Sequence, residues 1–170
     1  MHDQATLLAT LDTLGIAHDN IRHDAVFTVE ESEGLHTAIP GLHTKNLFLK
    51  DKDGRFWLVT VEAHARVDLK ALPAAIGAKK LSFGKAEDME RLLGVSPGAV
   101  TPLAAINDVD GTVSVVLDAT VASAPRVNVH PLENIATVGL SGADLVKALA
   151  AWGHSPAVIP VPSAGLDKQD

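Results

Sequence analysis

Leucines recur at helical spacing near the start of the chain. Leu7, Leu8, Leu11 and Leu14 fall on one side of a helix with 3.6 residues per turn, and Gly15 follows them as a stop signal. This pattern predicts a helix over residues 4–14. Capping and stop residues predict four more helices: from the capping box at 28–31 to near Gly34, from Asp68 to Ile76, from Ala86 to Leu93, and from Ser141 to about Trp152.

Short apolar runs between these segments predict β-strands. The runs cover residues 47–49, 56–61, 81–83, 103–106, 113–117, 127–129, 135–138 and 158–159. The turn at 51–54 predicts a hairpin between the first two runs, and residues 107–111 join the fourth run to the fifth. The stretch 94–102 contains two Gly and two Pro, which is typical of a defined loop.

The order of these elements indicates the fold class. Helices interrupt many short strands without a regular strand–helix–strand alternation, so we expect an α+β fold. We predict one domain over residues 1–170, with a mixed, largely antiparallel central sheet surrounded by helices. Its core should span about residues 5–160, and the tail from Pro160 should be loose.

Composition restricts the class of protein and the compartment in which it is expected. The chain has 170 residues, of which 46% are hydrophobic and 21% charged, so it can bury one substantial core. The absence of cysteine excludes disulfides and thiolate nucleophiles. The apolar runs are shorter than a membrane span, and the first residues lack the basic region of a signal peptide. We therefore expect a soluble cytoplasmic protein with no membrane partner.

The net charge of −7 argues against a nucleic-acid partner, but the charge is unevenly distributed. Residues 45–91 contain ten of the fourteen Lys and Arg and seven acidic residues, whereas residues 1–44 contain one Arg and seven acidic residues. The middle of the chain can therefore present a locally positive face to phosphates, although the same residues could simply solvate the surface.

Standard catalytic and cofactor signatures do not occur. The sequence has no P-loop, no G-x-G-x-x-G and no H-E-x-x-H, and its eight histidines form no compact ligand pattern. Ser141 with Asp144 is typical of a helix cap rather than a nucleophile. We expect neither a metal site nor a cofactor.

Three local groups of residues can support chemistry. Lys45 and Asn46 stand side by side at the start of an apolar strand, where Lys could hold a phosphate or an oxyanion and the amide of Asn could orient a substrate amine or carbonyl. The loop Gly98–Pro102 could bring backbone N–H groups close to an ester carbonyl. His130 precedes a proline and could serve as a base, a donor to substrate or a structural brace. Each group has an ordinary structural explanation as well: a solvated strand end, a turn and a brace.

Together and in this order, these groups resemble the bacterial prolyl-tRNA editing superfamily, the YbaK type. That family comprises the insertion-type editing domain of prolyl-tRNA synthetase and its freestanding relatives. The resemblance covers about residues 5–160 and rests on 44–49 (TKNLFL), on 98–102 (GAVTP, the family's G-x-x-x-P loop) and on 130–137 (HPLENIAT). Glu133 stands where an apolar residue is more usual. The chain looks most similar to the freestanding alanine-specific branch.

The resemblance implies a reaction and a site. The expected reaction is hydrolysis of mischarged Ala-tRNA(Pro) by water, assisted by a hydroxyl of the terminal ribose and without a protein nucleophile. Lys45, Gly98 and His130 would be catalytic, with Lys45 at the terminal adenosine phosphate. The expected substrate-binding residues are Asn46, Ala99, Val100, Thr101 and Pro102. The partners would be the acceptor end of tRNA(Pro) and, as a candidate, prolyl-tRNA synthetase, but not DNA.

A size argument supports such an activity. A synthetase pocket shaped for proline discriminates against the smaller alanine by only about 1–3 kcal/mol, so a second, smaller pocket is needed to remove the error. Three alternatives remain at this stage. The chain could deacylate another mischarged tRNA, such as Cys-tRNA(Pro) or Ser-tRNA, or it could be a non-catalytic module that binds tRNA or a synthetase. It could also be a hydrolase of a small ester or amide unrelated to tRNA, although the locally positive middle of the chain argues against this.

Overall fold

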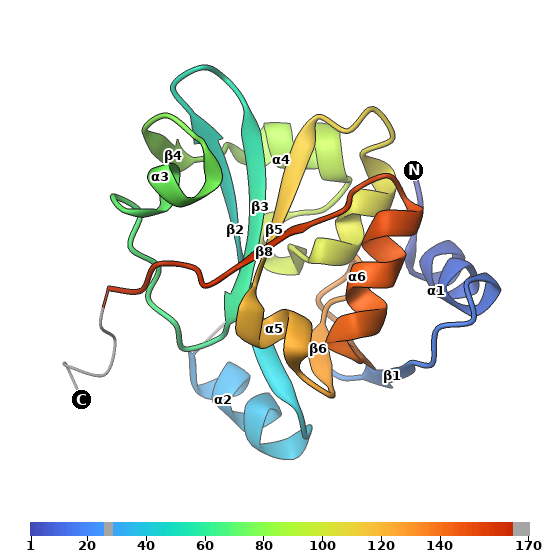
Figure 1. The fold of residues 1–170 in the computed structure, drawn as a ribbon. Helices are drawn as coiled ribbons and strands as arrows, with labels where there is room; N and C mark the ends of the chain where they lie inside the picture. Colours follow the sequence, from blue (N-terminus) through green and yellow to red (C-terminus); the bar gives the residue numbers. More distant parts are fainter. Residues whose placement is uncertain (26–28, 165–170) are drawn as a thin grey trace.

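A mixed sheet of eight strands runs through the centre of the molecule (Figure 1). The computed structural model describes residues 1–25 and 29–164. The strand order is β1-β7-β6-β2-β3-β5-β8, and β4 pairs with the far end of β2. The strands are β1 (Asp19–Arg22), β2 (Leu42–Asp51), β3 (Phe56–Glu62), β4 (Leu81–Phe83), β5 (Val113–Asp118), β6 (Val127–Val129), β7 (Ala136–Leu140) and β8 (Ala157–Ile159).

The long strand β2 joins the two halves of the sheet. Its first residues, Leu42 and His43, pair in parallel with β6, and its remaining length pairs antiparallel with β3 from Thr44 to Lys50. Parallel pairs also connect β3 to β5 and β5 to β8, while β1–β7, β6–β7 and β2–β4 are antiparallel. The change of partner along β2 places an irregular opening beside Thr44–Asn46.

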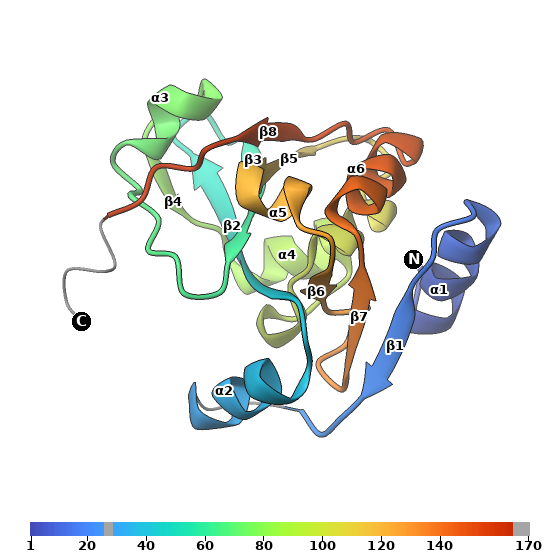
Figure 2. The same cartoon turned by 60° about the horizontal axis from the view of Figure 1, so that its bottom comes forward.

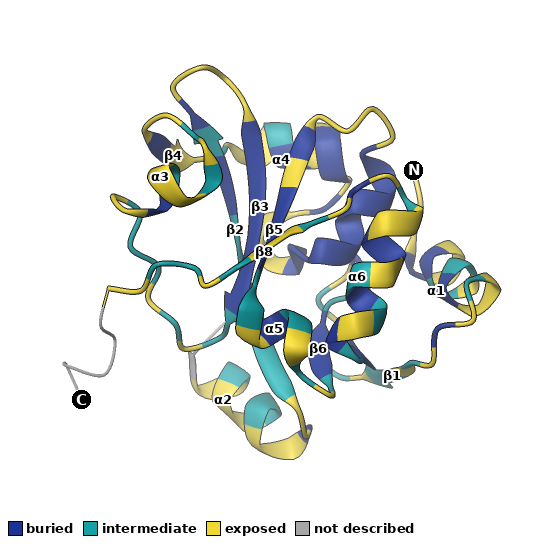
Figure 3. Cartoon of the chain, viewed as in Figure 1, coloured by how far each residue is buried: buried dark blue, intermediate teal, exposed yellow. Residues whose placement is uncertain are grey.

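The two faces of β3 are buried against different apolar clusters. Side chains alternate between the faces of a strand, so Phe56 and Leu58 lie in one cluster, and Trp57, Val59 and Val61 lie in the other. Figure 3 shows the resulting buried centre of the sheet. Burial on both faces explains why 56–61 is apolar at every position except Thr60.

Helices cover the sheet unequally (Figures 1 and 2). Leu72 of α3 packs in the smaller cluster, whereas α1, α4, α6 and the 3₁₀ helix η2 contribute to the larger one. α2 lies at the edge of the molecule next to the first residues of β2. The helices are α1 (Gln4–Thr13), α2 (Val29–Ala38), α3 (Leu72–Ile76), α4 (Ala86–Leu93), η1 (Pro97–Ala99), η2 (Pro102–Asn107), α5 (Ala119–Ser123) and α6 (Gly142–Ala151). Among the described residues, no helix has the length and apolar character needed to cross a membrane.

The α+β fold class and the mixed central sheet are confirmed, as is the helix over Ala86–Leu93, which Gly94 ends in the left-handed conformation. Two helices differ from expectation at their bounds. α2 continues past Gly34 to Ala38, and its predicted capping residue Thr28 lies outside the described residues. Asp68 caps a turn through the N–H groups of Lys70 and Ala71, so α3 begins only at Leu72.

The prediction of a strand over 103–106 is wrong. Residues Pro102–Asn107 form a 3₁₀ helix, which Thr101 caps by accepting the N–H of Leu103. Pro102 occupies the first position of this helix, where its missing N–H costs nothing. A run of four buried apolar residues fits a strand and a buried helical turn equally well, so its polarity pattern could not decide between them.

The chain after Pro160 is also more ordered than expected up to Ala164. The N–H of Val161 donates to the Asp118 carboxylate at 2.7 Å, and Ser163 pairs with Val67. Two short elements, β1 and α5, were not predicted, because neither carries a clear apolar period.

Candidate active site

A cavity of about 260 Å³ opens where β2 changes partner. Its walls come from α2, from the first half of β2, from the loop at η1 and from the ends of β6 and β7. The lining residues are Ser32, Leu35, His36, His43, Thr44, Lys45, Asn46, Pro97, Gly98, Val100, Asn128, Val129, His130 and Thr137. All three stretches singled out in the sequence therefore meet at one cavity.

Lys45 contributes the cationic side chain of the cavity wall. It is half-buried, and burial lowers the pKa of its ammonium group. Glu62 opposes this shift and Arg66 adds to it. A half-buried ammonium group that has lost part of its water shell gains more from a phosphate or an oxyanion than a fully hydrated one does.

Asn46 ties the cavity wall to the neighbouring strand and loop. Its Nδ2 donates to the carbonyl of Val100 at 3.0 Å, and its Oδ1 accepts the hydroxyl of Thr60 at 2.6 Å. Thr60 is fully buried. Both ends of the amide are thus engaged within the protein, so Asn46 fixes the distance between β2 and the loop, with one N–H left to offer a substrate.

The residues of the loop 97–102 differ in exposure. Gly98 is exposed and lines the cavity, and the buried Val100 lines it as well. Ala99, Thr101 and Pro102 are buried behind it in the core or in the cap of η2. Gly98 does not need glycine for its own backbone: its φ is not in the left-handed region, and a Cβ there would meet only Asn134 Nδ2, at 3.6 Å. Its lack of a side chain instead keeps the cavity open.

His130 lies at the end of β6 on the opposite wall. Its Nδ1 donates to the carbonyl of Ala136 at 3.4 Å, which leaves Nε2 as the acceptor of a neutral ring. Burial lowers the pKa of His130, so the neutral form is favoured at pH 7. Two residues later, Leu132 has a φ of 72°, a conformation that side chains other than glycine rarely adopt. Strain of this kind concentrates at functional sites.

The cavity combines the cation of Lys45 with neutral polar groups. No Asp or Glu occurs among the described residues that line it. The lining therefore offers groups that bind phosphate and polarise a carbonyl, but not the carboxylate-oriented base of a catalytic triad. Such a site can orient an ester and stabilise the negative charge of its tetrahedral intermediate while a water molecule attacks.

Several lining residues were not singled out by the sequence, chiefly Leu35, His36 and His43 on one wall and Asn128 on another. The histidine count was the only available signal. Their convergence depends on how α2 lies against β2 and on the parallel pairing of β2 with β6, and no local pattern encodes either feature.

The arrangement can hold an ester beside a phosphate group. Comparison with known proteins gives the family. Residues 23–148 match the aminoacyl-tRNA editing domain. Over 156 residues the chain is 38% identical to prolyl-tRNA editing protein ProX of Acetoanaerobium sticklandii, covering 91% of this chain and 95% of that protein. Over 161 residues it is 37% identical to prolyl-tRNA synthetase associated domain-containing protein 1 of Mus musculus, covering 92% and 95%.

Solved structures share the fold. A crystal structure described as that of a candidate trans-editing enzyme for prolyl-tRNA synthetase superposes with a TM-score of 0.71 at 21% identity, covering 95% of this chain and 98% of that one. This chain belongs to the aminoacyl-tRNA editing domain family, as its sequence motifs indicated. It is a hydrolase of the aminoacyl-tRNA deacylase type.

Proposed function

We propose that this protein hydrolyses mischarged Ala-tRNA(Pro) in trans, releasing alanine and tRNA(Pro). The observation that carries the proposal is the small cavity in which Lys45, Gly98 and His130 meet, in a chain that aligns with ProX over almost its full length. The proposed catalytic roles of these three residues follow from that meeting.

The size of the cavity supports a small aminoacyl group. About 260 Å³ is below the roughly 300–1,000 Å³ usual for sites that enclose a whole small molecule. The cavity suits an alanyl ester with part of the terminal ribose, while the rest of the acceptor end stays outside. A proline ring adds carbons, and we propose that the cavity excludes it by size.

The proposed chemistry uses the cavity walls as follows. Lys45 holds the terminal phosphate, and the Gly98–Val100 segment faces the ester carbonyl, which it orients for attack. Water adds to the carbonyl carbon, the intermediate collapses, and the ribose oxygen leaves as a hydroxyl. His130, neutral because it is buried, accepts a hydrogen bond through Nε2 from the substrate ammonium group or from the attacking water.

The decisive experiment follows the release of labelled amino acid from Ala-tRNA(Pro), with Pro-tRNA(Pro), Cys-tRNA(Pro) and Ser-tRNA(Pro) alongside. Rapid loss of alanine with retention of proline is expected. Preferential loss of cysteine or serine would keep the reaction and replace the substrate. No hydrolysis of any of the four would overturn the proposal.

Binding should also depend on salt. If the acceptor end supplies the affinity through its phosphates, the Kd for uncharged tRNA(Pro) rises steeply between 50 and 200 mM salt, by about tenfold or more for a few phosphate contacts. Fluorescence anisotropy with labelled tRNA measures this. A Kd that stays constant over the same range contradicts a phosphate-based substrate site.

A further inference from the structure

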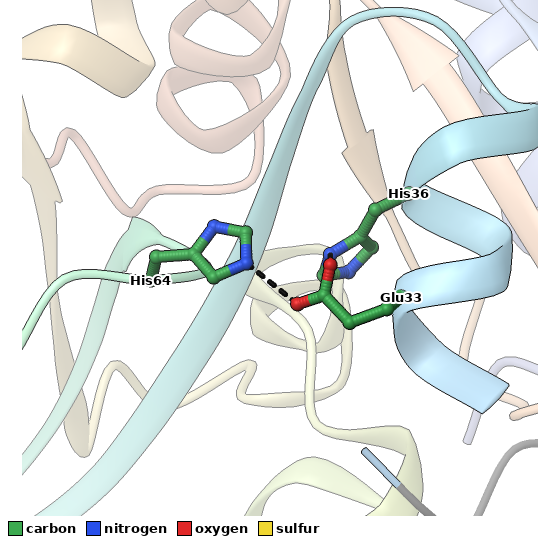
Figure 4. A group of neighbouring side chains, drawn as sticks. All are labelled: Glu33, His36 and His64. Carbon is green, nitrogen blue, oxygen red and sulfur yellow. Dashed lines mark hydrogen bonds and ion pairs between the residues drawn. The ribbon is translucent and has the colours of Figure 1, made fainter. Parts of the chain in front are cut away.

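Three potential metal ligands converge beside the cavity. Among the described residues, Glu33, His36 and His64 form a group in which one donor atom from each lies within 4.8 Å of the others. Glu33 and His36 are three residues apart on α2 and so share one face of that helix, whereas His64 belongs to the turn after β3. In Figure 4 the carboxylate of Glu33 lies between the two imidazole rings.

The spacing is close to that of a coordination shell. His64 Nε2 donates to Glu33 Oε1 at 2.7 Å, and His36 Nδ1 lies 3.8 Å from Glu33 Oε2. Donors bound to one zinc ion at about 2.0–2.1 Å stand roughly 3.4 Å apart in a tetrahedron. Glu33 and His64 are exposed, so their side chains can close the remaining distance by small rotations.

His36 is prepared for such a role. Its Nδ1 is buried and makes no hydrogen bond, and its ring packs on His43 with centroids 4.3 Å apart. Burial is the main cause that lowers the pKa of His36, and the neutral ring is the form that binds metals. A buried ring nitrogen without a hydrogen bond is costly unless something occupies it.

His64 has the outer contact that metal-binding histidines usually have. Its Nδ1 donates to Glu62 Oε1 at 2.9 Å, and its backbone N–H donates to Glu62 Oε2 at 2.7 Å. A carboxylate on the far nitrogen fixes the ring and makes the near nitrogen a better ligand. Nε2, which faces Glu33, would exchange its proton for the metal ion.

We propose that Glu33, His36 and His64 form a binding site for a divalent transition-metal ion, with Zn²⁺ the best match. Two imidazoles and one carboxylate suit zinc, cobalt or nickel better than magnesium or calcium, which prefer all-oxygen shells. Three protein ligands leave a fourth position for water or a substrate group. No local sequence pattern marks this site, because its ligands lie on two separate elements, with His36 and His64 28 residues apart.

The proposed metal site lies next to the cavity, so a bound ion would affect the cavity wall. His36 also lines the cavity, and α2 forms one of its walls. A metal ion held by this group would tie α2 to the turn after β3 and so fix that wall.

Titration of the untagged protein with ZnCl₂ by calorimetry, and the visible absorption of bound Co²⁺, test the proposal. One ion per chain is expected. Glu33→Gln and His64→Gln should each weaken binding at least tenfold, and Glu62→Gln by about tenfold through loss of the outer contact. These positions are exposed or half-buried, and circular dichroism will verify that the variants fold.

His18→Gln is the matched control, because His18 also pairs with a carboxylate, Asp12, at 2.8 Å but outside this group. It should change the Kd for Zn²⁺ by less than twofold. Three results would overturn the proposal: no binding by the wild type, unchanged binding by Glu33→Gln and His64→Gln, or an equal loss in His18→Gln.

Discussion

Burial of Lys45 has opposite effects on function and folding. Its pKa is lowered because the charged form loses water in the fold, so the ammonium group is less favourable in the folded chain than in the unfolded chain at neutral pH. Lys45→Met keeps the aliphatic stem and removes the charge. We expect kcat/KM for deacylation to fall about 100-fold or more, while the midpoint of thermal unfolding stays equal or rises. If the variant is both active and less stable, Lys45 does not act in catalysis.

Substitution of Gly98 tests whether the substrate approaches this residue closely, because alanine adds a single methyl group. Since the fold itself has room for a Cβ at this position, Gly98→Ala should unfold within a few degrees of the wild type. The methyl group enters the cavity instead, so deacylation should slow at least about tenfold. Gly98→Val should slow it further, and thermal unfolding together with initial rates measures both. Unchanged rates in both variants would mean that the ester does not approach this segment.

The pH dependence of stability reports on His130. Its folded pKa lies below the ordinary value of about 6.5, so between these two values the unfolded chain binds more protons than the folded chain. The free energy of unfolding should therefore fall as the pH decreases through 6.5, and His36 acts in the same direction.

His64 acts in the opposite direction, since Glu33 and Glu62 raise its pKa. A comparison with His130→Gln isolates the contribution of His130. Urea unfolding at pH 5, 6 and 7 should give the variant a shallower fall than the wild type, by at most about 1.4 kcal/mol per pH unit. Parallel curves would show that His130 titrates alike in both states.

At the scale of elements, the contact between α5 and α6 depends on one glycine. A Cβ on Gly142 would collide with the backbone carbonyl oxygens of Val121 and Ala122, which cannot move without shifting α5. Gly142→Ala should therefore reduce the free energy of unfolding by about 1–3 kcal/mol, as measured by urea denaturation.

Gly34→Ala in α2 is the matched control for this substitution, because its Cβ would meet nothing within 4 Å. Alanine is the better helix former, so this variant should be neutral or more stable by up to about 1 kcal/mol. Equal effects at the two positions would argue against the collision.

Elements with their own local signals were predictable from the sequence. α4 has Met89, Leu92 and Leu93 at helical spacing and a glycine at its end, and both bounds were correct. The hairpin of β2 and β3 was marked by its turn, but β2 itself extends five residues further toward the N-terminus, to Leu42. The half-buried polar residues His43–Asn46 interrupt the apolar pattern that predicts a strand. Their polar side chains face the cavity rather than bulk solvent.

The candidate site was predictable only in part, because tertiary packing decides which residues face the cavity. Lys45, Asn46, Gly98, Val100 and His130 line the cavity, and the family resemblance pointed to them. The wall formed by α2 was not foreseen, because its position follows from tertiary packing. The burial of Ala99, Thr101 and Pro102 could not be predicted either, because a loop sequence does not show which of its residues face inward.

At the scale of the whole molecule, the order of strands brings residues from most of the chain to the cavity. Residues from Ser32 to Thr137 line it, and the sheet joins segments that are distant in sequence, such as Asp19 with Gly139. Few of these contacts are local, so folding of the site requires nearly the complete sheet.

This strand order matters while the protein is still being made on the ribosome. Until translation has passed Thr137, the nascent polypeptide lacks β7, and with it one wall of the cavity and the strand that pairs with β1. Chains cut short by a premature stop codon before that point should have no deacylase activity at all. Their unpaired strand edges would mark them for chaperones and proteases instead.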